Sequence, residues 1–162
     1  MTGGLPNGVG TYSFTATARD KAGNVAMVTG TYRVIYGFYG FLQPINDTGR
    51  PAVCGSPCPV SVFNGGSTIP VKFQLKRADG TIVQANSAPQ WLTPARGAAL
   101  SLPVDESPPS GTASSGTAYR WDGTSRQYIY NWGTKGVKTG YYWRVGVTLD
   151  DGETYYVTIG LR

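Results

Sequence analysis

Apolar and polar positions alternate along residues 68–76, which read TIPVKFQLK. The apolar members of this run are Ile69, Val71, Phe73 and Leu75. A period of two is the pattern of a β-strand that buries one face. The run therefore predicts a half-buried strand, and no convincing amphipathic helix is found anywhere in the chain.

The same alternation returns near the end of the chain, on both sides of the turn sequence Asp150-Asp151-Gly152. Its apolar positions are Trp143, Val145, Val147, Leu149, Tyr155, Val157, Ile159 and Leu161. An Asp-Gly step between two alternating runs is a strong hairpin signal. We expect a hairpin over 143–161, preceded by two shorter strands at 118–122 and 126–132.

Two more alternating runs, with a turn at 19–24, predict a hairpin within residues 9–35. A single hairpin cannot bury its own apolar face in water. This hairpin is therefore either the remnant of a larger module or must dock on the domain after it. The aromatic and glycine-rich residues 36–44 are expected to pack on the sheet of that domain. Residues 94–117, rich in Pro, Ser, Gly and Ala, are expected to form a long, mobile surface loop.

Composition fits an all-β antiparallel sandwich built from short strands and many turns. Of 162 residues, 40% are hydrophobic, 23 are Gly and 11 are Pro. No apolar run is long enough for a transmembrane helix. The opening residues have no apolar core of a signal peptide, so we expect the carboxyl-terminal part of a longer exported protein.

The net charge of +5 comes from basic residues that are scattered along the chain. Nucleic-acid binders usually concentrate such charge in a stripe with aromatic residues between. A solvated basic surface is therefore favoured over nucleic-acid binding, with weak attraction to anionic cell-wall polymers left open.

The two cysteines, Cys54 and Cys58, lie in the sequence CGSPC. Three intervening residues, with Gly and Pro among them, suit a small disulfide loop in an exported protein. Structural thiols remain an alternative, and a redox role is disfavoured because a redox motif has two intervening residues. A zinc site would need more ligands than a chain without His supplies.

Catalysis is not expected, and neither a metal nor a cofactor is implied. Without histidine, the usual Ser-His and Cys-His arrangements are excluded. Six of the nine acids lie in or beside expected turns, where Asp is favoured for its geometry. The chain is therefore interpreted as a non-enzyme.

Aromatic residues offer one route to a ligand, since a flat aromatic strip could stack on sugar rings. Tyr128, Tyr130 and Trp132 share one strand face and are expected to be core, because large aromatics dominate small β-cores. The better candidates for exposed, ligand-facing aromatics are Tyr119, Trp121, Tyr141 and Tyr156.

A covalent Lys72–Asn131 crosslink between strands is a further hypothesis. It would need a buried carboxyl group beside it, and the sequence identifies none. Lys72 is more readily interpreted as reaching the surface.

Residues 10–34, GTYSFTATARDKAGNVAMVTGTYRV, resemble the last two strands of extracellular bacterial immunoglobulin-like repeats. In some such repeats an Asp at the turn lies near calcium. For Asp20 a plain Asx-type turn is the preferred interpretation.

Residues 36–162 resemble the PxKF family of bacterial extracellular domains. The motifs are Pro70-Val71-Lys72-Phe73, together with GFYGFLQPIND, YRWD with QYIYNWGTKG, and TGYYWRVGVTLDDG with TYYVTIGLR. The resemblance implies a non-catalytic β-module near the carboxyl end of secreted or surface-anchored proteins. No catalytic residues come with it.

Together these features predict two units: 1–35, the end of an immunoglobulin-like repeat, and 36–162, a PxKF-type immunoglobulin-like β-sandwich. The expected role is that of an extracellular accessory or spacer domain, with a carbohydrate-binding module as the alternative. The expected partners are neighbouring domains of the parent chain and, as an open alternative, cell-wall or other polysaccharide. We expect a monomer that neither binds nucleic acid nor inserts into a membrane.

Overall fold

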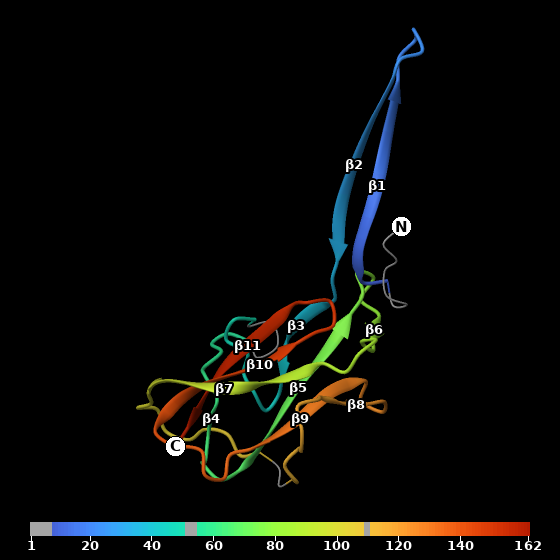
Figure 1. Cartoon of the computed structure of the whole chain (residues 1–162). Coiled ribbons are helices and arrows are strands. Elements are labelled where there is room, and N and C mark those ends of the chain that lie inside the picture. Colours follow the sequence, from blue (N-terminus) through green and yellow to red (C-terminus); the bar gives the residue numbers. More distant parts are fainter. Residues whose placement is uncertain (1–7, 51–54, 109–110) are drawn as a thin grey trace.

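The computed structural model describes residues 8–50, 55–108 and 111–162. Strands alone make up its regular structure, and no helix occurs within these ranges. Two sheets pack face to face, and a long two-stranded hairpin projects from one end of the pair (Figure 1). The prediction of an all-β sandwich is confirmed.

The strands form three sheets. Their bounds are β1 (Gly10–Arg19), β2 (Val25–Val34), β3 (Gly37–Leu42), β4 (Val62–Phe63), β5 (Thr68–Lys76), β6 (Ile82–Val83), β7 (Gln90–Ala99), β8 (Arg120–Asp122), β9 (Gln127–Gly133), β10 (Tyr141–Thr148) and β11 (Thr154–Leu161). The projecting hairpin is β1-β2. The two sheets of the sandwich run in the orders β4-β11-β10-β7 and β3-β5-β9-β8, and β6 pairs with β5.

The β10–β11 hairpin forms the middle of the first sheet. Its strands pair from Tyr141 opposite Leu161 to Thr148 opposite Thr154, and the turn between them is the predicted one. The edge strand β7 pairs antiparallel with β10, with two register shifts. At the other edge β4 runs parallel to β11. Among the named strands of the described residues, β4 and β11 are thus the one parallel pair, and the other pairs are antiparallel.

Strand β5 is the organising strand of the second sheet, and its bounds agree with the predicted 68–76. It pairs with β3 on one side and with β9 on the other. Buried and half-buried residues alternate along the whole of β5 and along β9. Because each strand buries only one face, the alternation visible in the sequence is the alternation between core and surface.

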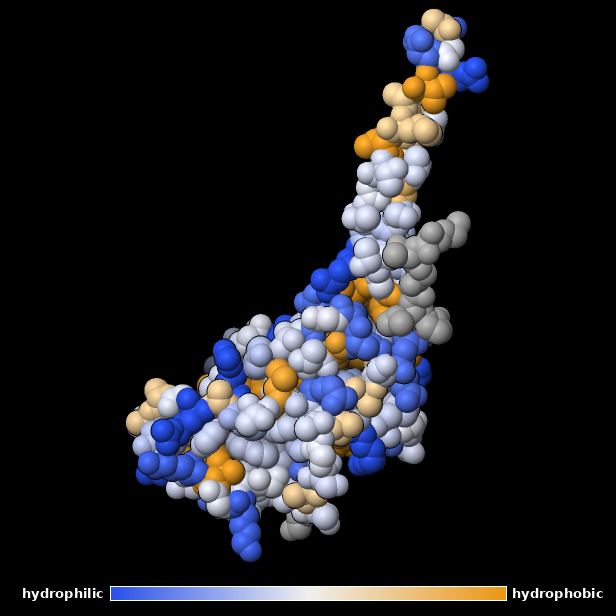
Figure 2. Space-filling view, in the orientation of Figure 1, coloured by the Kyte–Doolittle hydropathy of each residue, from blue (hydrophilic) through white to orange (hydrophobic). Residues whose placement is uncertain are grey.

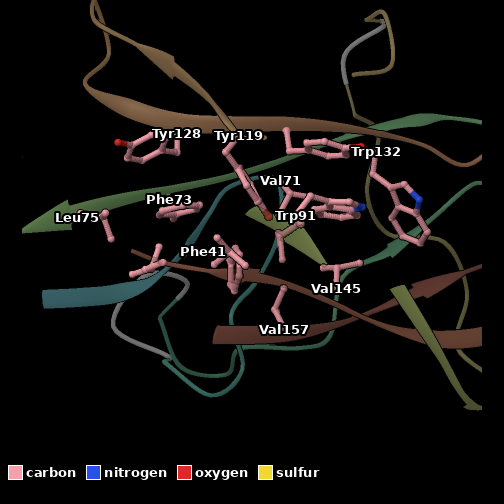
Figure 3. Packing of buried hydrophobic residues seen from close by; sticks show 14 of the residues in the cluster. Phe41, Val71, Phe73, Leu75, Trp91, Tyr119, Tyr128, Trp132, Val145 and Val157 are labelled. Carbon is pink, nitrogen blue, oxygen red and sulfur yellow. The ribbon is translucent and has the colours of Figure 1, made fainter. Parts of the chain in front are cut away.

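The core between the sheets is rich in aromatic rings (Figure 3). Phe73 is fully buried and lies 5.4 Å from Phe38, 5.0 Å from Tyr119 and 5.2 Å from Tyr128, measured between ring centroids. From the opposite sheet, β10 and β11 bury Val145, Val147, Val157, Ile159 and Leu161. Burial of such side chains contributes roughly 1.5–3 kcal/mol each to folding.

The β1–β2 hairpin has one apolar face and one largely hydroxyl-bearing face. Cross-strand pairing places these side chains on the apolar face: Tyr12, Phe14, Ala16, Ala18, Ala26, Val28 and Tyr32. Phe14 is 50% exposed, Val28 63% and Tyr32 52%. Figure 2 shows hydrophobic residues along the projecting hairpin. The two strands predicted within residues 9–35 are thus present, but almost the whole hairpin is solvent-exposed.

The base of the hairpin is attached to the sandwich. Val9 and Tyr36, which flank the two strands, are 3% and 2% exposed and belong to the core. The Tyr36 N–H donates to Asp151 Oδ2 at 2.9 Å, and the Arg33 guanidinium donates to the Asp151 carbonyl at 3.1 Å and to the Glu153 carboxylate. The hairpin is thus held at its base by the turn between β10 and β11.

The prediction of a mobile loop over 94–117 is wrong for its first part, because β7 continues to Ala99. Of the ten residues of β7, only Trp91 is buried, so the strand carries no apolar alternation. Pro94 is tolerated because β7 is an edge strand. The following residues are not free either, since Glu106 forms a bridge with Phe63 of β4.

Candidate functional site

Tyr119 is not an exposed aromatic, and the prediction of its exposure is wrong. Its side chain is 2% exposed and points between the sheets (Figure 3). Its hydroxyl donates to the Gly146 carbonyl at 3.3 Å. Burial, with a smaller effect from Tyr130, raises the pKa of Tyr119 well above its usual value. Tyr119 lies just before the short strand β8, where the sequence gives no sign of which face is covered.

The expectation that Tyr128, Tyr130 and Trp132 are core residues is confirmed, with exposed fractions of 1%, 7% and 7%. Trp91 of the opposite sheet stacks on Tyr130 with 4.3 Å between ring centroids. These rings therefore join the two sheets and are not available to stack on a ligand.

Of the other candidate aromatics, Trp121 is half-buried and packs on Tyr128 with 4.9 Å between centroids. Tyr141 is also half-buried, whereas Tyr156 is exposed, and each has a cation over its ring. The Arg144 guanidinium lies 4.5 Å from the centroid of Tyr156. Tyr141 lies under two basic side chains, one from β7 and one from the segment before β10.

A groove of about 470 Å³ lies on the sheet that contains β7, β10 and β11. Its lining residues are Ala95, Arg96, Gly97, Ala98, Tyr142, Arg144 and Thr158. No carboxylate lines it. Neither Tyr141 nor Tyr156 is among the lining residues, and the pairing of β10 with β11 places these two tyrosines on opposite faces of the sheet.

Asp20 and Asp122 serve turn geometry, as predicted from their positions, whereas Asp151 and Glu153 also bind the base of the hairpin. Both carboxylate oxygens of Asp20 accept hydrogen bonds from Asn24, one from its side chain at 2.7 Å and one from its N–H at 2.9 Å. Asp122 accepts a hydrogen bond from the Ser125 hydroxyl at 2.5 Å. These side-chain hydrogen bonds are the main reason that the pKa of each carboxyl group lies below its usual value. Each carboxylate is thereby committed to its own turn.

Asp105 and Glu106 have a role that the sequence did not indicate. Asp105 Oδ1 accepts the Val62 N–H at 2.6 Å, and Glu106 Oε1 lies 3.0 Å from the Ser61 hydroxyl. Burial raises the pKa of Glu106, opposed by the hydrogen bond with Ser61. The two acids anchor the segment after β7 to β4. Their position within a polar, proline-rich stretch had favoured a loop free of such contacts.

The predicted Cys54–Cys58 disulfide lies outside the described residues, because Cys54 is not among them, and it stays a prediction. Lys72 and Asn131 are not opposite one another: Lys72 pairs with Ile129 and Asn131 with Pro70. The Asn131 side-chain amide donates to the Thr112 carbonyl at 3.0 Å. This arrangement gives no support to the crosslink hypothesis.

Among the described residues, no group of three or more Cys, Asp and Glu side chains is placed to hold a metal ion. The described chain likewise forms no helix of the length and apolarity that crossing a bilayer requires. Comparisons with protein families, with curated proteins and with solved structures find no match for this chain. The resemblances seen in the sequence are therefore the basis of a proposal.

Proposed function

We propose that this chain is a non-catalytic accessory and spacer module of a larger bacterial extracellular protein. Residues 36–162 would be its PxKF-type immunoglobulin-like sandwich, and residues 1–35 the end of a preceding immunoglobulin-like repeat. The observation that supports this most is the β1–β2 hairpin, whose apolar face is uncovered while its base is fixed to the sandwich.

The uncovered apolar face is of the kind that packs against a second sheet in a β-sandwich. Most of its apolar side chains lie on one face of the two strands, and the opposite face carries mostly Thr and Ser, with Val25 and Met27 near the turn. A two-stranded sheet is marginally stable in water, and both of its edges offer unpaired backbone groups. Further strands of the same polypeptide, placed beside the hairpin and over its apolar face, would satisfy both needs.

The attachment at the base suits a spacer. Only Ile35 and Tyr36 separate β2 from β3, and Tyr36 is buried. The contacts of Arg33 and of the Tyr36 N–H with the β10–β11 turn restrict how the hairpin can swing. Two modules joined in this way keep a defined distance and orientation relative to each other, as a spacer domain requires.

Hydrogen exchange tests this proposal by comparing the isolated chain with a longer chain that includes the residues encoded upstream of Met1. We expect the amides of β1 and β2 to exchange rapidly in the isolated chain and to become protected in the longer one. The amides of β5 serve as the control, because they should be protected in both. Equal, rapid exchange of the hairpin in both chains, or an upstream sequence without alternating strands, would contradict the proposal.

A second candidate function is carbohydrate binding, favoured by the groove on β7 and β10, whose lining includes Tyr142, and by the 42% exposed ring of Tyr156 on the neighbouring strand β11. Isothermal titration against a panel of cell-wall and plant polysaccharides separates the two. A chain that serves as a spacer alone gives no heat with any member of the panel.

A further inference from the structure

The side chains on the apolar face of the β1–β2 hairpin decrease in size from its base to its tip. Cross-strand pairing arranges them in four successive pairs: Tyr12–Tyr32, Phe14–Gly30, Ala16–Val28 and Ala18–Ala26. The two pairs nearer the base carry the aromatic rings, whereas the two pairs nearer the tip carry only alanine and valine. This face is therefore thick at one end and thin at the other.

The rings at the thick end are packed on one another and on the backbone. Tyr12 and Tyr32 stack with 5.4 Å between ring centroids, and the Tyr12 hydroxyl donates to the Gly8 carbonyl at 2.9 Å. Phe14 lies across Gly30, since a Cβ atom added to Gly30 would come within 2.7 Å of the Phe14 ring. The rings of Tyr12, Phe14 and Tyr32 thus form an aromatic ridge across both strands.

The thin end carries a hollow of about 220 Å³, which we call the tip hollow. Its lining residues are Ala16, Thr17, Ala18, Ala26, Met27 and Val28. Because side chains alternate between the two faces of a strand, the three alanines and the valine supply the apolar surface of this hollow. No charged residue lines it, and it is large enough for one bulky apolar side chain.

The size gradient restricts what can pack on this face. Two sheets that pack face to face lie about 10 Å apart, and protein interiors are close-packed. A large side chain of one sheet must therefore meet a small side chain of the other. A sheet that covers the hairpin needs small residues over the aromatic ridge and a bulky apolar residue over the tip hollow.

The area of the face indicates which molecule supplies that cover. The four pairs span about 20 Å along the strands and about 10 Å across them. Stable complexes between separate molecules usually bury about 1,200–2,000 Å² in total, which is more than two faces of this size provide. A segment of the same polypeptide loses no independent translational freedom when it packs, so a smaller area is sufficient. The face therefore suits a neighbouring segment of its own chain better than a second copy.

We propose that strands encoded upstream of Met1 place one bulky apolar side chain in the tip hollow and residues no larger than Ala or Ser over the aromatic ridge. This inference rests on the proposed spacer function, which takes upstream strands as the cover of the hairpin, and adds the chemistry and position of the contact. The upstream sequence should contain an alternating run with a bulky apolar residue and a small residue on the same face, about four residues apart. Alternating strands without such a run would overturn this inference and leave the spacer function standing.

Hydrogen exchange of the longer chain tests the contact directly. Ala16→Trp fills the tip hollow from the hairpin side and should lower the protection of the β1 and β2 amides about tenfold or more. Ser13→Trp is the matched control, because it adds the same side chain to the opposite face of β1 and should change protection less than about twofold. In the isolated chain, where Ala16 and Ser13 are both exposed, neither variant should alter the protection of β5.

The outcomes separate this inference from the spacer function. Protection of the hairpin that persists in the Ala16→Trp variant of the longer chain would overturn the inference alone, because the tip hollow would then be unfilled. Rapid exchange of the hairpin in the unsubstituted longer chain would contradict both. Sedimentation equilibrium of the isolated chain checks the remaining occupant, and we expect a monomer. A dimer that Ala16→Trp dissociates and Ser13→Trp does not would identify a second copy as the cover and overturn the inference.

Discussion

Replacing Tyr128 by Phe should destabilise the sandwich through a single buried hydrogen bond. The Ala85 N–H donates to the Tyr128 hydroxyl at 2.7 Å, and the two residues are 8% and 1% exposed. The phenyl ring keeps its packing on Phe73 and Trp121, so the change isolates the hydroxyl group. A buried N–H left without an acceptor costs about 1–3 kcal/mol, and we expect a loss in that range in the free energy of unfolding.

Tyr130→Phe is the matched control for this experiment. The Tyr130 hydroxyl donates to the carbonyl of Gly116, an exposed residue whose carbonyl can bind water instead. Its loss should therefore cost at most about 1 kcal/mol. Urea unfolding, followed by near-ultraviolet circular dichroism, measures the loss in the free energy of unfolding for both variants. The m-value, the slope of that free energy against urea concentration, should be the same as in the wild type. If Tyr128→Phe costs less than Tyr130→Phe, the Ala85 hydrogen bond does not stabilise the sandwich by this amount.

Other predictions concern the core, alkaline pH and the hairpin base. Phe73→Ala should cost about 3–5 kcal/mol in urea unfolding, because it empties the centre of the aromatic cluster, whereas Phe14→Ala on the exposed hairpin should cost less than about 0.5 kcal/mol. Burial raises the pKa of Tyr128 to about 12 and that of Tyr119 well above its usual value. Because an unfolded tyrosine titrates near pH 10, the folded chain retains protons that the unfolded chain releases, and stability should fall as pH rises from about 10 to about 12. A urea midpoint that stays constant between about pH 10 and about pH 12 would contradict the raised pKa values of these two buried tyrosines. Arg33→Ala should leave the free energy of unfolding within about 1 kcal/mol of wild type but widen the angular range of the hairpin in small-angle scattering; unchanged scattering would show that other contacts hold the base.

Strands that bury one face completely could be predicted from the sequence alone. Residues 68–76 alternate without interruption, and the structure makes them β5 with the same bounds. Strand β7 could not be found in this way, since its pairing with β10 depends on backbone hydrogen bonds and its side chains are mostly exposed. The two-residue strand β4 is too short to show any period. Its place is decided by parallel pairing with β11, a contact distant in sequence.

The candidate site was harder to predict than the fold. Tyrosines occur both in the core and on the surface: Tyr119 is buried, while Tyr156 is 42% exposed. What separates them is the covering layer, which depends on how the two sheets stack. The pairing of Arg144 with Tyr156 and of Arg96 with Tyr141 likewise arises from neighbouring strands and could not be read from spacing along the chain.

The course of the chain through the sandwich determines how it responds to tension. A pull applied between Tyr36 and Leu161 enters at the end of the sandwich beside the β10–β11 turn and leaves at the other end, where Leu161 pairs with Tyr141. The load therefore runs along the strands, and the hydrogen bonds that hold β11 to β10 and β4 are sheared together rather than opened one after another. A module loaded in this direction resists extension far better than one whose end strands are peeled apart.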